Sequence, residues 1–215
     1  MATTPDGSPV EVYLHLPEGG EAELVHGTIP EGADILELGC GVGRVTHELV
    51  RLGHPVVAVD ESAEMLAHVR GAETVRSRIE ELHLGRRFAC VLMMSHLVNT
   101  EESQRAAFLS TAARHVAPDG VVLMERYDPA WQPEEGSAKR RGDVLISLED
   151  VRIGREHFSA TARYQLGDRI WRQPFTAWIL DDRQLGESLA AAGLELIYPL
   201  DDSCRWVAAR PILSA

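Results

Sequence analysis

Cysteine is scarce in this chain of 215 residues. Only Cys40, Cys90 and Cys204 are present, an odd number without paired spacing. Zinc sites typically use a closely spaced cysteine pair or two histidines on one helix, and His47-Glu48 lacks the second histidine, so the sequence predicts no metal. Free thiols suit a reducing compartment, and no basic-then-apolar leader opens the chain. We therefore expect a cytoplasmic protein.

An excess of positive charge is also missing. The chain has 21 Lys and Arg against 33 Asp and Glu, a formal net charge of -12. Its one dense basic run, residues 139–141, follows two glutamates and is typical of a solvated loop. Nucleic-acid binding needs clustered cations, so we expect no nucleic-acid partner. No apolar run has membrane-spanning length, so we expect no membrane partner either.

The first half alternates strand-like and helix-like patterns. Strands are predicted at 33–38, 55–59, 73–75, 88–94 and 121–125. Helices are predicted at 44–52, after Ser62, and from Thr100 to Val116, with a turn at 118–120. Nearly continuous apolar strands separated by helices are typical of a parallel sheet covered on both faces.

The second half has a different pattern. A loop is predicted over 131–142, followed by strands at 144–153, 157–166 and 170–180 with short polar separators. Their apolar-polar alternation favours an antiparallel sheet. Asp181 or Asp182 then begins a helix that ends near Gly193, and 194–198 with 205–209 form a closing hairpin. The sequence thus predicts an α/β core with a β-rich insertion.

The strongest motif is residues 37–44, Glu-Leu-Gly-Cys-Gly-Val-Gly-Arg, between the first strand and the first helix. Glycines there let the backbone turn sharply and approach a ligand. The third glycine comes one position earlier than in the dinucleotide fingerprint, which disfavours a nicotinamide dehydrogenase. Glu37 would repel a pyrophosphate and favour a ligand with an amino group and a sulfonium. The alternative is a generic strand-turn-helix connection.

Asp60 ends the second predicted strand, about 20 residues after the glycine loop, where an acidic side chain accepts ribose hydroxyls. The alternative is a helix N-cap. Its predicted place at the carboxyl edge of the sheet, beside the loop, favours the ribose role.

These motifs resemble the class I S-adenosylmethionine (SAM)-dependent methyltransferases. The similarity covers residues 37–44, residues 57–66 and the entry to the fifth strand at 115–123, within roughly 30–125, and the closing hairpin. It implies a Rossmann-like, seven-stranded, mostly parallel sheet whose last hairpin strand is antiparallel. It also implies one domain with four parts. These are an N-terminal lid segment (1–30), a cofactor-binding core (31–130), an antiparallel β insertion (143–180), and a closing helix and hairpin (181–215).

The resemblance assigns SAM as the cofactor and implies a set of binding residues. They are Tyr13, Glu37, Gly39, Cys40, Gly41, Gly43, Asp60, Glu61, Met65, Ile79, Glu80, Met94 and Ser95. Arg78 stands where the family often has the Asp that contacts adenine, and Phe88-Ala89 replaces a common Phe-Asp. The Ile79 N–H and the Glu80 carboxylate are the expected substitutes at adenine.

Two side chains are candidates for catalysis. His96 follows the fourth strand and is a candidate general base, because imidazole titrates near neutrality. Its alternative is a pocket-shaping role. Tyr127 and Trp131 follow the fifth strand and are candidates for the acceptor site, with packing under the insertion as the alternative. Tyr13 is a candidate lid residue over the cofactor, with an ordinary surface contact as its alternative.

The insertion after the fifth strand resembles that of glycine N-methyltransferase and the amino-sugar N-methyltransferases. This predicts methyl transfer from SAM to a nitrogen or oxygen of a small-molecule acceptor. The rival hypothesis is a non-catalytic SAM- or nucleoside-binding protein of the same fold. The insertion is also a candidate for a homodimer interface.

Overall fold

A computed structural model describes residues 4, 7–95, 97–200 and 204–212. Its main element is a seven-stranded sheet in the order β10-β11-β5-β4-β1-β2-β3. The strands are β1 (Ile35–Leu38), β2 (Val56–Asp60), β3 (Glu73–Arg76), β4 (Phe88–Met93), β5 (Val116–Glu125), β10 (Leu194–Pro199) and β11 (Trp206–Pro211). All neighbours pair in parallel except across the two sides of β11. The fold predicted from the sequence is confirmed.

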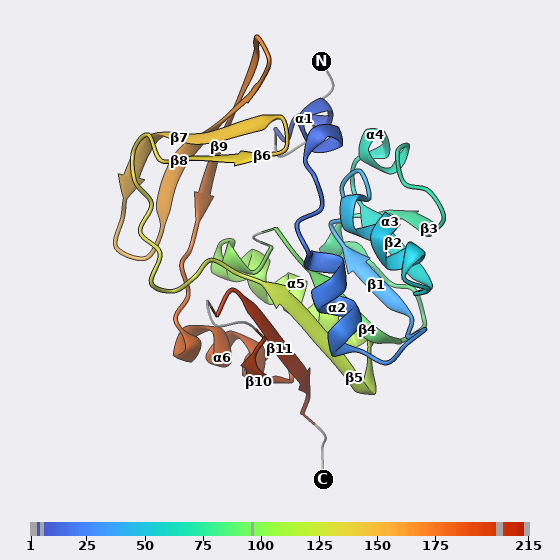
Figure 1. Cartoon of the computed structure of the whole chain (residues 1–215). Coiled ribbons are helices and arrows are strands. Elements are labelled where there is room, and N and C mark those ends of the chain that lie inside the picture. Colours follow the sequence, from blue (N-terminus) through green and yellow to red (C-terminus); the bar gives the residue numbers. More distant parts are fainter. Residues whose placement is uncertain (1–3, 5–6, 96, 201–203, 213–215) are drawn as a thin grey trace.

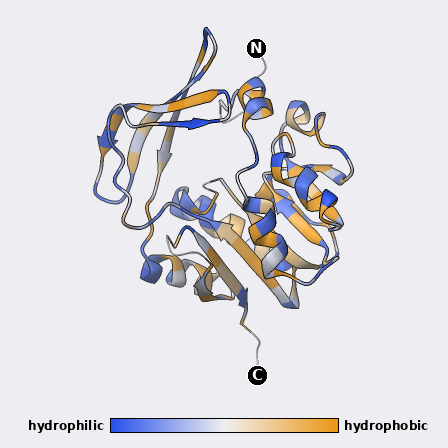
Figure 2. Ribbon diagram, in the orientation of Figure 1, coloured by the Kyte–Doolittle hydropathy of each residue, from blue (hydrophilic) through white to orange (hydrophobic). Residues whose placement is uncertain are grey.

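Helices cover both faces of this sheet (Figure 1). They are α2 (Glu21–Thr28), α3 (Arg44–Arg51), α4 (Ala63–Leu66), α5 (Glu102–His115) and α6 (Asp182–Ala191), with 3₁₀ turns η1 (Ile79–Glu81) and η2 (Leu97–Asn99). Successive residues of β1 point to opposite faces, so Leu36 packs with α5 and α6, whereas Ile35 packs with α2 and α3. Figure 2 shows the hydrophobic residues gathered along these central strands.

The helix boundaries follow local chemistry. The Ser62 hydroxyl accepts the Met65 N–H and so begins α4. Asp181 forms a capping box with Gln184 and begins α6.

The turn predicted at 118–120 is wrong. Helix α5 ends at His115 and the chain enters β5 directly at Val116, with an irregularity in the pairing of β5 to β4. No helix in the part of the chain that the structure describes is long and apolar enough to cross a bilayer.

The insertion forms a separate four-stranded antiparallel sheet between β5 and α6. Its strands are β6 (Ala138–Arg141), β7 (Val144–Ile153), β8 (Phe158–Leu166) and β9 (Arg169–Ala177), hydrogen-bonded in chain order. Figure 1 shows this sheet standing beyond the edge of the core. The prediction of a loop up to residue 142 was wrong for β6, whose polar sequence has no strand pattern and pairs with β7 as an edge strand. The last strand ends at Ala177, three residues before the predicted end.

Helix α1 (Val10–His15) lies between the two sheets (Figure 1). Val12 packs into the insertion cluster of Val144, Ala162, Tyr164 and Trp171. Val10, on the same helix, packs against Val42 and Met65 of the core, with Tyr13 beside them. The N-terminal segment therefore contacts both the glycine loop and the insertion. Neither α1 nor α2 was predicted, because segments of six and eight residues are too short to show a clear helical period.

Candidate functional site

The glycine loop joins β1 to α3. Gly39, Gly41 and Gly43 all have left-handed backbone conformations, with φ of 70°, 57° and 83°. At Gly39 a Cβ would lie 3.2 Å from a Leu97 methyl group, a tight contact that would require Leu97 to shift. A Cβ at Gly41 would meet no protein atom within 4 Å. The loop thus turns a bare stretch of backbone toward open space, as a close-approach ligand site requires.

Asp60 ends β2 beside this loop, as predicted. One carboxylate oxygen accepts the Gly41 N–H at 2.9 Å, and the other accepts the Ser62 N–H at 2.9 Å. The carboxylate therefore holds the glycine loop and the start of α4 together. It is half-buried at the carboxyl edge of the sheet, where parallel α/β folds bind ligands.

Glu37 lies in β1 and is fully buried. Its Oε2 accepts the Thr46 hydroxyl at 2.5 Å, while its Oε1 has no hydrogen-bond partner among the described residues. Burial raises the pKa of Glu37 to about 7, although the Thr46 hydrogen bond and the Arg44 charge oppose this. A buried carboxylate oxygen without a donor is costly, and a cationic or N–H-bearing ligand would satisfy it.

The other predicted cofactor residues lie around the same loop or further along the edge. Met65 is buried against Val42, and Tyr13 packs beside both. Cys40 is buried under the loop, where burial and the nearby Glu37 and Asp60 charges raise the pKa of its thiol. The Glu61 carbonyl accepts from Arg76.

The predicted adenine residues have other contacts. The Ile79 side chain is buried in the core beneath α5, which leaves only its backbone for a ligand. Glu80 is ion-paired with Arg78, the residue that stands in place of the family's Asp. The structure thus gives Glu80 a partner within the chain.

The chain leaves β4 through Met94 and Ser95. Met94 is buried, whereas Ser95 is exposed and has a left-handed φ of 53°, rare for a residue with a side chain. Its N–H donates to Glu125 Oε2 at 3.1 Å, and Arg205 donates to Oε1 of the same carboxylate at 2.6 Å. Glu125, at the end of β5, was not predicted from the sequence. His96, the predicted general base, lies outside the described residues.

Tyr127 lies in an aromatic cluster at the base of the insertion. Its ring stacks on Trp131 with centroids 4.9 Å apart and meets Phe158 edge-on at 5.7 Å. Burial raises the pKa of the Tyr127 hydroxyl, and the Glu125 and Tyr13 charges add to this. A raised pKa keeps the phenol protonated at neutral pH, so it can donate a hydrogen bond but is a poor base.

Asn99 holds both connections between the core and the insertion, a role that the sequence did not reveal. Its side-chain oxygen accepts the Tyr127 N–H at 3.0 Å, and its amide donates to the Trp178 carbonyl at 2.5 Å. The Trp178 N–H returns a bond to the Asn99 carbonyl at 2.8 Å. The buried amide thus fixes where the insertion leaves and re-enters the core.

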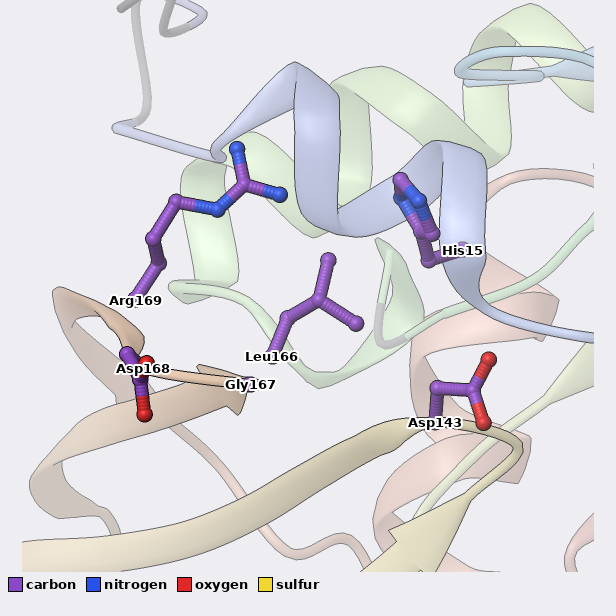
Figure 3. Close-up of a pocket in the computed structure, with 6 residues that line it drawn as sticks. All are labelled: His15, Asp143, Leu166, Gly167, Asp168 and Arg169. Carbon is purple, nitrogen blue, oxygen red and sulfur yellow. The ribbon is translucent and has the colours of Figure 1, made fainter.

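An open hollow lies elsewhere, between α1 and two turns of the insertion (Figure 3). It is lined by His15, Asp143, Leu166, Gly167, Asp168 and Arg169. None of the predicted cofactor or catalytic residues lines it. It marks the seam between the N-terminal segment and the insertion.

Comparison with known proteins points to one kind of domain. Residues 35–120 match the family model described as a methyltransferase domain. A Streptomyces fradiae dTDP-3-amino-3,6-dideoxy-alpha-D-glucopyranose N,N-dimethyltransferase is 36% identical over 121 residues, 53% of this chain and 46% of the relative. A ubiquinone biosynthesis O-methyltransferase from Rhodopseudomonas palustris is 27% identical over 110 residues, 47% of this chain and 43% of the relative. The chain thus spans less than half the length of these relatives.

Solved structures match over nearly the whole chain. The CcbJ methyltransferase from Streptomyces caelestis has a TM-score of 0.73 at 20% identity, covering 98% of this chain and 93% of that one. SAM-bound CalS10, an amino pentose methyltransferase from Micromonospora echinaspora, has a TM-score of 0.67 at 21% identity and covers 87% of each chain. At this identity the likeness concerns the fold, and it includes the insertion.

Proposed function

We propose that the whole chain transfers a methyl group from SAM to a small-molecule acceptor, on the premise that residues 35–120, which match a methyltransferase domain model, form a class I SAM-dependent methyltransferase domain. The observation that carries the proposal is found at one edge of the sheet. There an open glycine backbone and the Asp60 carboxylate meet the buried Glu37 carboxylate, one oxygen of which has no hydrogen-bond donor among the described residues. Each of these features suits one part of SAM.

The residues of this edge fit the cofactor in the following way. Gly41 presents bare backbone to open space, which lets a ligand lie against the loop. Glu37 offers a buried acceptor to a cationic group. Asp60 offers carboxylate oxygens for ribose hydroxyls, although both also serve backbone N–H groups. Met65 and Tyr13 supply an apolar cover.

When bound, SAM would supply an electrophilic methyl group on a sulfonium. The protein would then have to align the acceptor, exclude water and accept one proton. Proximity provides much of the rate in such a displacement. The aromatic cluster around Tyr127 is suited to excluding water, and a protonated Tyr127 hydroxyl is suited to orienting the acceptor. We retain His96 as the candidate that takes the proton, because it directly follows Ser95 at the end of β4.

We propose a nitrogen, such as the amine of an amino sugar, as the acceptor atom rather than an oxygen. The relative with 36% identity is an amino-sugar N,N-dimethyltransferase, and CalS10 acts on an amino pentose. The similarity to a ubiquinone biosynthesis O-methyltransferase instead favours an oxygen. We further propose a cytoplasmic enzyme, in keeping with its free thiols, and an insertion that serves as a homodimer interface.

The test is turnover. The purified chain would be incubated with SAM and a panel of dTDP-amino sugars and matched hydroxy sugars, and S-adenosylhomocysteine and methylated product would be measured. Methylation of the amino sugars alone supports the proposal, and methylation of the hydroxy sugars alone would contradict the choice of nitrogen. Tight SAM binding without turnover on any acceptor would favour the non-catalytic alternative.

A further inference from the structure

Three segments meet at one buried carboxylate, that of Glu21 at the start of α2. Arg44, the first residue after the glycine loop, donates to Glu21 Oε1 at 2.8 Å. Arg141, at the end of β6 in the insertion, donates to the same oxygen at 3.0 Å. The side chains of Glu21 and Arg44 are only 9% and 15% exposed, so these charges are largely shielded from solvent.

A second acceptor repeats the arrangement. The Pro17 carbonyl lies 3.3 Å from Arg44 Nη1 and 3.4 Å from Arg141 Nη2, so both guanidinium groups reach the same two acceptors. The turn after β6 also packs on Pro17, because a Cβ at Gly142 would lie 3.1 Å from the proline ring. The N-terminal segment is therefore a bridge whose two ends are the glycine loop and the insertion.

The same carboxylate is firmly ionised. Burial alone would raise the pKa of Glu21, but the Arg44 charge and the Gly19 N–H outweigh it and lower the pKa to about 2. At neutral pH the two arginines therefore always face a full negative charge.

Further polar contacts join the insertion to the part of the N-terminal segment that precedes Pro17, at and just before α1. Arg169, the first residue of β9, is ion-paired with Glu11 of α1, and Figure 3 shows its side chain extending toward that helix. Gln173 of β9 donates to the Ser8 hydroxyl at 2.9 Å. Helix α1 in turn packs on Val42 of the glycine loop. Every one of these contacts ties the insertion to the N-terminal segment and through it to the loop.

We infer that Glu21 is a positioning residue that couples the glycine loop to the insertion, so that filling the cofactor site also orders the sheet that covers the acceptor. The inference rests on the proposed function, because it takes the glycine loop as the cofactor site. Without the Glu21 charge the loop and the insertion would each keep their own fold, but the ordering of the loop would no longer stabilise the β6–β7 hairpin through this carboxylate.

The test compares hydrogen exchange of the full chain with and without S-adenosylhomocysteine. In the wild type the ligand should slow exchange at residues 39–43 and also at the β6–β7 hairpin, residues 138–147. Arg141→Met, which cuts only the insertion side, should keep the first effect and lose the second. Glu21→Gln should lose the second effect and weaken binding of S-adenosylhomocysteine by about tenfold, as the loss of a charge-assisted pair predicts.

The chain offers a matched control. Glu149 of β7 also receives two arginines, Arg163 and Arg172, but both lie within the insertion sheet. Glu149→Gln should therefore leave both protection effects and the affinity unchanged. A general loss of stability would not distinguish Glu149→Gln from the other two variants. Ligand-dependent protection of residues 138–147 does, because only Arg141→Met and Glu21→Gln should lose it.

The outcomes are distinct. Ligand protection of residues 138–147 that is equal in wild type and Arg141→Met would overturn the coupling. Protection confined to residues 39–43 in the wild type would overturn it as well and would leave the proposed function standing. No protection at residues 39–43 in the wild type would refute the cofactor site itself, and the coupling with it.

Discussion

The two sheets of this protein build their sites in different ways. At its edge the core presents backbone: a glycine turn and the ends of parallel strands, which the Asp60 carboxylate holds in place by accepting two N–H groups. The insertion offers side chains instead, with an aromatic cluster at its base and ion pairs at its outer turns. Backbone geometry suits a ligand that never changes, whereas side chains can be exchanged without disturbing the fold. The contrast favours a fixed cofactor in the core and a variable acceptor under the insertion.

Removing the insertion tests this contrast most severely. Replacement of residues 138–177 by a short Gly-Ser linker should abolish methyl transfer, because the acceptor loses its aromatic wall and its shield from water. Binding of S-adenosylhomocysteine should persist, because the glycine loop and Asp60 remain. Activity assays and calorimetry would measure the two. Full turnover by the shortened chain would show that the core alone recognises the acceptor.

Gly41→Val attacks the core side. The backbone there has φ of 57°, and the new side chain would enter the space that we assign to the cofactor. Affinity for S-adenosylhomocysteine should fall about 100-fold, or roughly 3 kcal/mol.

Gly32→Val is the control for Gly41→Val. It also has a positive φ, 71°, with nothing near its Cβ, but it lies in the loop before β1. Both variants should lose similar stability in thermal unfolding, and only Gly41→Val should lose affinity. An equal loss of affinity in both would remove the glycine loop from the site.

Asp60→Ala should have a smaller effect. It removes the carboxylate that we assign to the ribose hydroxyls, and charge-assisted hydrogen bonds are worth about 1.5–3 kcal/mol. Calorimetry should show a tenfold to roughly 100-fold loss of affinity for S-adenosylhomocysteine. Asp34→Ala is the control, because Asp34 also accepts a backbone N–H, that of Ala89, but precedes β1 at the opposite edge. Unchanged affinity in Asp60→Ala would move the ribose site elsewhere.

The same contrast separates what the sequence could and could not predict. The core strands, the glycine loop and the place of Asp60 were predicted correctly, because buried parallel strands are apolar throughout and glycine marks left-handed backbone. Residues 35–120, which contain the glycine loop and Asp60, match a methyltransferase domain model. The four charged and small residues of β6 carry no such pattern, since only pairing with β7 makes them a strand.

The sequence did not predict the hydrogen bonds and ion pairs between side chains and distant segments. Asn99, Glu125 and Glu21 each join segments far apart in the sequence, and nothing near each residue signals its partner. Tyr127 was named as a catalytic candidate, and the structure adds that its ring is packed against Trp131 and Phe158. Long-range polar contacts depend on the assembled fold, so a pattern read along the chain does not contain them.

Changes at Glu37 should have the smallest effect, but they test one carboxylate of the core through its pH dependence. Its pKa of about 7 lies above the ordinary value of 4.5, so the folded chain holds a proton between these limits that the unfolded chain has released. The free energy of unfolding should therefore fall as the pH rises through this window.

A cationic ligand favours the ionised Glu37 carboxylate, so affinity for SAM should rise with pH toward 7, by at most about tenfold per pH unit. Glu37→Gln should reduce the dependence of SAM affinity on pH over this range. Thr46→Val removes the hydrogen bond that lowers the Glu37 pKa and should move the midpoint to higher pH. Calorimetric titrations from pH 5 to pH 8 would measure all three proteins, and an equal slope in the wild type and Glu37→Gln would show that SAM does not sense this carboxylate.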